Sequence, residues 1–314
     1  MMTFPDSPRP DRRGFLECMT WAGAGLAWTV AGGVPGAADL GPAAAATRLR
    51  IQPFTFVQVS DSHIGFSKPA NPDARATFRE AVAKIRNLPT TPAFIVHTGD
   101  VSQLSKDAEF DDADQILKEA GLPVFHIPGE HDVLDEGAGA AFLARYGKGA
   151  TGGGWYAFDH AGVHFVALVN VVDLKAGGLG NLGESQLAWL QNDLAGRSAR
   201  TPIVVLAHIP LWAVYPQWGW GTDDGARALG LLRRFGSVTV LNGHIHQILQ
   251  KVEGTITFHT ARSTAFPQPA PGTAPGPGPM TGPAGQLAAV LGVREVSFAR
   301  AGRAPGLADT TLAA

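Results

Sequence analysis

The sequence predicts an α/β domain in which two β-sheets pack face to face and helices cover their outer surfaces. Two observations favour this architecture. Apolar runs typical of strands alternate with segments of helical apolar spacing through the middle of the chain. Two further pairs of strands are separated by the hairpin signals Asp159–Gly162 and Glu253–Gly254. The chain has 314 residues, which is long enough to bury one sizeable core.

The expected strands are short apolar runs, rich in the β-branched and aromatic residues that fit a pleated, buried surface. In chain order they are Phe54–Val59, Phe94–Val96, Val124–Ile127, Trp155–Phe158, Val163–Val169, Ile203–Ala207, Val238–Leu241, Gln247–Val252, Thr255–His259 and Val293–Phe298. The expected helices have apolar residues three or four positions apart, and the first has Asp73 as a possible cap. They are Asp73–Asn87, Lys106–Ala120, Glu184–Leu194 and Asp223–Phe235.

The N-terminus has the form of a twin-arginine export signal. Arg12 and Arg13 precede the apolar stretch Met19–Val34, which is too short and too rich in glycine and alanine for a good membrane span. We therefore expect residues 1–46 to be a signal and short linker, and the mature chain to be periplasmic or secreted without a membrane anchor. The alternative is a disordered basic N-terminus with an incidental apolar run. The single cysteine, Cys18, precedes the apolar stretch, so the mature chain would form no disulfide.

The remaining chain is expected to hold one catalytic domain, residues 47–266, followed by residues 267–314. The segment Pro267–Gly285 is too rich in proline and glycine for regular structure. It is read either as a long loop before a last strand, Val293–Phe298, or as the start of a partly disordered tail. The formal net charge of −2 and the absence of a Lys/Arg stripe argue against general nucleic-acid binding.

Groups of histidines and carboxylates follow five of the expected strands. In chain order these groups are Asp61 with His63, Asp100 after Gly99, Gly129 to Asp132, His208, and Gly243 with His244 and His246. Because α/β sheets place their sites at the carboxyl ends of strands, we expect these side chains to meet at one edge. Residues two apart in an extended strand end point to the same side, so Asp61 and His63 can hold one ion.

In order and spacing, these groups resemble the calcineurin-like metallophosphoesterases, whose pattern is D-x-H, G-D, G-N-H-D/E, H and G-H-x-H. The resemblance covers roughly residues 54–266, including Gly183–Leu194 and the His208–Pro210 motif, and it departs from the pattern at Glu130, where the family has Asn. It implies a four-layer α/β/β/α sandwich. It also implies that the chain hydrolyses small phosphodiesters or phosphomonoesters by attack of a metal-bound hydroxide.

The resemblance implies two divalent or trivalent transition-metal ions, Mn, Fe, Zn or Co, which suit imidazole and carboxylate ligands. The first ion would take Asp61, His63, Asp100 and His246. The second would take Asp100, Glu130, His208 and His244. His131 would be a catalytic histidine near the leaving group and not a ligand, and Asp132 would orient it.

Three functional classes remain open. The first is an exported two-metal phosphoesterase with a small-molecule substrate. The second is a Ser/Thr protein phosphatase, although the residues after Asp100 lack the longer G-D-x-x-D-R-G motif of that class. The third is a non-catalytic metal- or phosphate-binding protein, which Glu130 alone favours. The loop with Trp212, Tyr215, Trp218 and Trp220 would stack on a substrate ring, or would form a folded lid or a homodimer contact.

Overall fold

The computed structural model describes residues 26–31, 34–39, 52–282, 285–299 and 304–313. The chain divides into two units, Met1–Arg48 and Leu49–Ala314. In the first unit, β1 (Leu26–Ala31) pairs antiparallel with β2 (Val34–Asp39). Arg12 and Arg13, on which the export signal is predicted, lie outside the described residues. Within the described segments, no helix combines the length and apolar character that a membrane crossing requires.

The second unit contains two mixed sheets. One sheet has the order β13-β12-β3-β4-β5, in which β3, β4 and β5 run parallel and the other two strands are antiparallel to their neighbours. Its strands are β3 (Phe54–Val59), β4 (Ile95–Thr98), β5 (Val124–Ile127), β12 (Gly292–Phe298) and β13 (Gly306–Thr311).

The other sheet has the order β10-β11-β9-β8-β7-β6, in which β7, β8, β9 and β11 run parallel. The hairpins β6–β7 and β10–β11 are antiparallel and form its two ends. Its strands are β6 (Tyr156–His160), β7 (Val163–Ala167), β8 (Ile203–Leu206), β9 (Val238–Asn242), β10 (Gln250–Glu253) and β11 (Ile256–Thr260).

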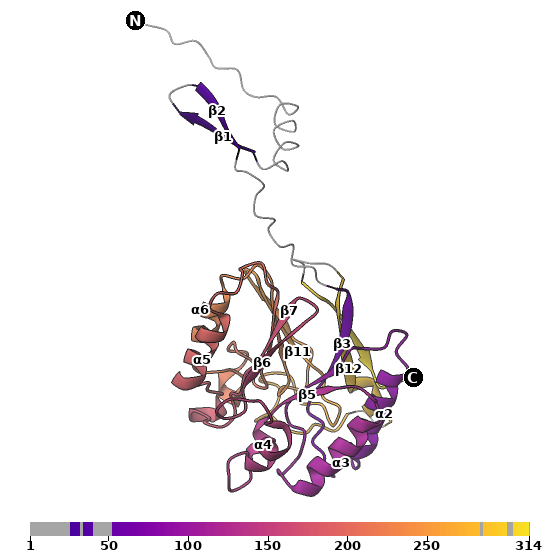
Figure 1. The fold of residues 1–314 in the computed structure, drawn as a ribbon. Coiled ribbons are helices and arrows are strands. Elements are labelled where there is room, and N and C mark those ends of the chain that lie inside the picture. Colours follow the sequence, from indigo (N-terminus) through magenta and orange to yellow (C-terminus); the bar gives the residue numbers. More distant parts are fainter. Residues whose placement is uncertain (1–25, 32–33, 40–51, 283–284, 300–303, 314) are drawn as a thin grey trace, which may run out of the picture. The chain divides into compact units, whose positions relative to one another are not determined.

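Helices cover the outer face of each sheet, and Figure 1 shows the resulting layers. Helices α2 (Ala74–Arg86) and α3 (Asp107–Lys118) cover one sheet, and α5 (Glu184–Leu194) and α6 (Gly225–Leu232) cover the other. The shorter elements are α4 (Ala140–Tyr146), α7 (Leu287–Val290), η1 (Glu130–Val133), η2 (Ala176–Gly178) and η3 (Pro216–Trp218). The predicted four-layer α/β/β/α sandwich is therefore confirmed.

The period-2 alternation of strand side chains separates three layers of core. In β8, Ile203 and Val205 pack under α5 and α6, whereas Val204 and Leu206 face the opposite sheet. Between the sheets lies an aromatic layer in which Phe56, Phe94 and Phe165 are almost completely buried. Packing on both faces thus fixes the register of the strands whose ends carry the site.

The structure contains elements that the sequence did not predict, among them β1, β2 and α7, and two further differences have a clear reason. Helix α4 was not expected, because its region is rich in glycine and alanine and has no clear apolar period. The expectation of a last strand at Val293–Phe298 was incomplete, since β13 follows it and continues the sheet. In β13, Gly306–Thr311 has little apolar character of its own, so its strand conformation depends on pairing with β12. Residues 267–282, as described, contain no helix or strand, in agreement with their composition.

Candidate metal centre

The loops that follow β3, β4, β5, β8 and β9 converge at the carboxyl edge of the two sheets. They bring together the predicted ligands in groups whose nitrogen and oxygen atoms lie within 4.8 Å of one another. Two of these groups are separate triads, Asp61 with His63 and His246, and Glu130 with His208 and His244. All seven predicted ligand positions therefore meet in one centre.

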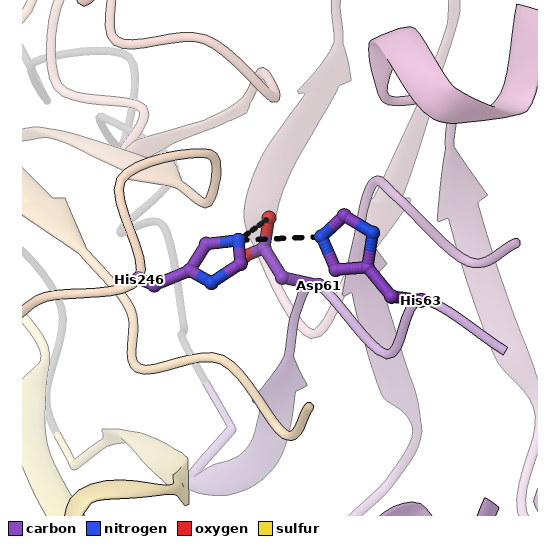
Figure 2. A group of neighbouring side chains, drawn as sticks. All are labelled: Asp61, His63 and His246. Carbon is purple, nitrogen blue, oxygen red and sulfur yellow. Dashed lines mark hydrogen bonds and ion pairs between the residues drawn. The ribbon is translucent and has the colours of Figure 1, made fainter. Parts of the chain in front are cut away.

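The first triad comes from the loops after β3 and β9, and Figure 2 shows its three side chains turned toward one another. Nε2 of His246 lies 3.3 Å from Oδ1 of Asp61 and 3.3 Å from Nε2 of His63. Nδ1 of His246 donates to the carbonyl oxygen of Phe266 at 2.6 Å, so this nitrogen carries the hydrogen. The Nε2 lone pair of the neutral ring is therefore aimed into the centre.

The second triad has the same construction. Nδ1 of His208 donates to the carbonyl oxygen of Thr98 at 2.7 Å, which leaves Nε2 for the centre. This Nε2 lies 2.9 Å from Oε2 of Glu130, and the other carboxylate oxygen of Glu130 lies 2.9 Å from Nδ1 of His244. Each carboxylate oxygen of Glu130 thus faces one histidine.

Asp100 lies between the two triads. Its Oδ2 is 3.4 Å from Nε2 of His63 and 3.5 Å from Nε2 of His208. Its other oxygen, Oδ1, accepts the backbone N–H of His131 at 2.9 Å. A carboxylate in this position faces a histidine from each triad, which is the arrangement that a bridging ligand requires.

The centre holds buried polar atoms that lack a hydrogen-bonding partner in the described part of the chain. They include Oδ2 of Asp61, Nε2 of His208 and both ring nitrogens of His244. Imidazole lone pairs that face ionised carboxylates repel them unless a proton or metal cation lies between. These nitrogen and oxygen donors suit Mn, Fe, Co and Zn, so the residues present fit a pair of such ions.

The titration behaviour agrees with a site built for cations. Burial alone would raise the pKa of Asp61, but His246 and His208 hold it below its ordinary value. Burial would likewise raise the pKa of Glu130, and His244 and His208 hold it well below its ordinary value. Both carboxyl groups therefore remain ionised and available to metal ions.

The backbone of these loops adopts conformations that side chains rarely take. Among the described non-glycine residues, eight have positive φ, and five of these are predicted ligands: Asp61, His63, Asp100, His244 and His246. Glycines allow the loops to approach closely, since a Cβ at Gly129 would meet the carboxylate and backbone nitrogen of Asp100. Gly99 has a φ of +96°, and a Cβ there would meet the ring of His208. Local strain is thus concentrated at the centre.

His131 lies beside the centre, its ring centroid 4.8 Å from that of His63. Nδ1 of His131 donates to the carbonyl oxygen of Gln103 at 2.8 Å, which leaves Nε2 to face outward from this contact. Burial would lower the pKa of His131, but Asp100 and Glu130 raise it above its ordinary value. A histidine so placed can give a proton to a substrate oxygen.

The expectation that Asp132 orients His131 was wrong. The carboxylate of Asp132 accepts backbone N–H groups of Val101, Ser102 and Gly129 at 2.8–3.0 Å, and the hydroxyl of Ser102 at 2.8 Å. It therefore ties the loop after β4 to the loop after β5, and the carbonyl oxygen of Gln103 orients the histidine instead.

Sequence reasoning missed the groups that orient the ligands. The carbonyl oxygens of Thr98 and Phe266 fix two histidine tautomers, and every residue has a carbonyl, so no residue type signals this role. Gln268, from the Pro/Gly-rich segment, donates to the carbonyl oxygen of His244 at 3.0 Å. The aromatic loop packs on itself, since Trp220 is buried and lies edge-on to Trp218.

Comparison with known proteins agrees with this geometry. Residues 54–248 match the family model described as calcineurin-like phosphoesterase. Glycerophosphodiester phosphodiesterase GpdQ of Enterobacter lignolyticus is 26% identical over 201 residues, covering 63% of this chain and 71% of the relative. A probable cyclic nucleotide phosphodiesterase of Synechococcus sp. is 27% identical over 220 residues, covering 68% of this chain and 83% of the relative.

Two solved structures share the fold. A dimetal phosphatase from Danio rerio gives a TM-score of 0.59 at 16% identity, with 81% of this chain and 98% of that chain covered. A purple acid phosphatase from yellow lupin gives a TM-score of 0.60 at 13% identity, with 84% and 52% covered. Since the family model spans more than half of the sequence, the chain belongs to the calcineurin-like phosphoesterase family and is a hydrolase.

Proposed function

We propose that the protein is an exported hydrolase of small phosphodiesters and phosphomonoesters, and that it works with two transition-metal ions. The observation that carries this proposal is the convergence of two triads, with Asp100 between them. The first ion would be held by Asp61, His63, His246 and Asp100. The second would be held by Asp100, Glu130, His208 and His244.

When bound, the two ions would supply the positive charge that neutralises the phosphoryl oxygens and activates a water molecule for attack. The chain's own residues orient the ligand histidines and supply a proton. The carbonyl oxygens of Thr98 and Phe266 hold the rings of His208 and His246 in the orientation required. His131, held by Gln103, gives its Nε2 proton to the oxygen that leaves phosphorus.

The substrate class is supported by the relatives, two of which are named as phosphodiesterases, and by the family. The ions proposed are Mn, Fe, Zn or Co, because imidazole and carboxylate donors suit them. The second candidate function is non-catalytic metal or phosphate binding. It is favoured by Glu130, which adds a third carboxylate at the centre.

A single assay separates these functions. The purified mature chain is analysed for bound metal, reloaded with each candidate ion, and offered a bis-aryl phosphate, a mono-aryl phosphate and a phosphoprotein. Turnover of either ester with two ions bound per chain is the expected result. Metal or phosphate binding without turnover under any loading would favour the binding protein, and turnover of phosphoproteins alone would favour a protein phosphatase.

A further inference from the structure

Three carboxylates, Asp61, Asp100 and Glu130, contribute negative charge to the metal centre. Among the described residues, every ion pair that they form is with a histidine, and none is with lysine or arginine. Histidines that bind metal are neutral and do not offset this charge. With the ions in place, the three carboxylates therefore contribute a charge of −3.

The three carboxylates are not equally placed. The side chains of Asp61 and Asp100 are 0% and 3% exposed, whereas that of Glu130 is 25% exposed. Asp61 and Asp100 are closed off from solvent, whereas Glu130 is partly open to it, although its Oε2 is buried. Glu130 is consequently the carboxylate that an incoming phosphate group would meet first.

This charge acts differently on monoanions and dianions. Whatever ions and hydroxide the centre holds, the carboxylate of Glu130 makes its net charge one unit more negative than a neutral side chain would. A phosphodiester carries one negative charge and a phosphomonoester two, so the carboxylate repels the monoester about twice as strongly. In a partly buried site, one charge a few ångströms away changes binding by roughly tenfold or more.

We propose that Glu130 is a specificity-determining residue, whose carboxylate makes the centre select monoanionic phosphodiesters against dianionic phosphomonoesters. The inference rests on the proposed function, because it assumes that the centre holds two ions. Its basis in this chain is the partly exposed position of Glu130 between His208 and His244, together with the absence of a lysine or arginine partner among the described residues.

Glu130→Gln tests the proposal, because it removes the charge and keeps the length and one oxygen donor. Metal content is measured first. Isothermal titration then gives the affinities of the metal-loaded proteins for inorganic phosphate and for dimethyl phosphate, near pH ~8, where inorganic phosphate is dianionic. The ratio of the two affinities reports charge selectivity without any turnover. Glu80→Gln removes the same charge from the exposed surface of α2 and is the control.

The expected result is that Glu130→Gln retains two ions and shifts the affinity ratio about tenfold toward inorganic phosphate, while Glu80→Gln leaves it unchanged. The ratio of mono-aryl to bis-aryl phosphate turnover should move in the same direction. An unchanged affinity ratio with both ions bound would overturn the proposal. So would the loss of one ion, because any change in selectivity would then follow from metal occupancy and not from the charge of the carboxylate.

Glu130→Asp, which keeps the charge and shortens the side chain, should retain the wild-type ratio. A shift as large as that of Glu130→Gln would contradict a charge effect. Failure of the proposed function can be told apart from failure of this inference. A wild-type protein that binds ions and both anions but hydrolyses neither ester would still give the ratio of the two affinities. A wild-type protein that binds no ions would overturn both proposals.

Discussion

At the scale of single residues, the centre depends on side chains that occupy unusual backbone conformations and on glycines that leave space for them. Asp61 has a φ of 53° and Asp100 has a φ of 53°, although aspartate seldom adopts positive φ. The loops tolerate this because Asp132 and the carbonyl groups around the centre hold them through many hydrogen bonds. Small changes in these loops should therefore have large effects.

Gly129→Ala tests the need for close approach. The added Cβ would collide with the carboxylate of Asp100, so we expect weaker metal binding and a loss of about 1–3 kcal/mol of stability. Urea unfolding and metal analysis measure the two effects. Gly230→Ala, in α6, is the matched control, since a Cβ there has open space and alanine favours a helix. Equal behaviour of the two variants would contradict the packing argument.

Asp100→Ala tests the bridging role. Because Oδ2 of Asp100 lies within 3.5 Å of a histidine from each triad, its removal should deplete both ions and reduce turnover by more than about 100-fold. Metal analysis and ester hydrolysis are the measurements, and Asp223→Ala, at an exposed position before α6, is the control. Near-native activity and metal content in Asp100→Ala would show that the two-metal assignment is wrong.

At the scale of elements, β13 is held to the sheet by a buried ion pair as well as by its backbone. The guanidinium of Arg294, in β12, is 2% exposed and donates to both carboxylate oxygens of Asp309, in β13, at 2.8 and 2.9 Å. The same guanidinium donates to the carbonyl oxygen of Thr260, in the other sheet, at 3.0 Å. Arg294 therefore joins three strands from two sheets.

Asp309→Ala leaves this buried guanidinium without its carboxylate. We expect a loss of about 2–4 kcal/mol, at the lower side of values for buried pairs because Asp309 itself is partly exposed. Chemical denaturation measures it. The exposed pair of Glu184 and Arg227 supplies the control, since Glu184→Ala should have a far smaller effect. If both variants unfolded alike, burial would not explain the contribution of Asp309.

A pH dependence follows from His97, in β4, which is buried and contacts the hydroxyl of Ser62 at 2.9 Å. Burial lowers its pKa from 6.5 to about 4, so the folded protein keeps the ring neutral where the unfolded chain would protonate it. Its contribution to stability is therefore full above pH 6.5 and is lost as the pH falls toward 4, by about 2–3 kcal/mol.

His97→Gln should flatten the stability profile over this pH range. Urea unfolding at several pH values, with a chelator present so that metal release does not contribute, provides the measurement. His160→Gln, at the half-buried end of β6, serves as the comparison. An identical pH slope in wild-type and His97→Gln proteins would exclude this histidine as the source.

At the scale of the whole molecule, the centre belongs to neither sheet alone. One sheet supplies Asp61, His63, Asp100 and Glu130, and the other supplies His208, His244 and His246. The ligands of each triad come from both sheets, so the aromatic layer between the sheets sets their separation. Packing at this layer thus controls the geometry of the site.

Export is a property of the whole chain that we propose from its N-terminus. Replacing Arg12 and Arg13 by lysine should hold the protein in the cytoplasm, because the paired arginines are the feature on which twin-arginine routing would depend. Cell fractionation and the N-terminal sequence of the exported protein measure it, with removal of roughly 38 to 46 residues expected. An unchanged periplasmic yield of the double variant would rule out this route.

The sequence by itself determined the sandwich and the identity of the residues that meet at its edge. Strands such as Phe54–Val59 and Val124–Ile127 begin and end where their largely apolar runs do, because side chains packed against neighbouring layers must be mostly apolar. The groups that follow them could be recognised because parallel strands bring their carboxyl ends to one edge.

Only the tertiary structure decided how these residues work together. The strand β13 forms because β12 offers it a partner, and no local apolar pattern marks it. The carbonyl oxygens of Thr98 and Phe266 orient histidines that are not their neighbours in the chain. Because every residue has a carbonyl group, the sequence does not show which of them take this role. Asp132 accepts hydrogen bonds from the loop after β4, and the carbonyl oxygen of Gln103 orients His131. The sequence does not show this, because hydrogen-bond partners are set by distance in space and not by adjacency in the chain.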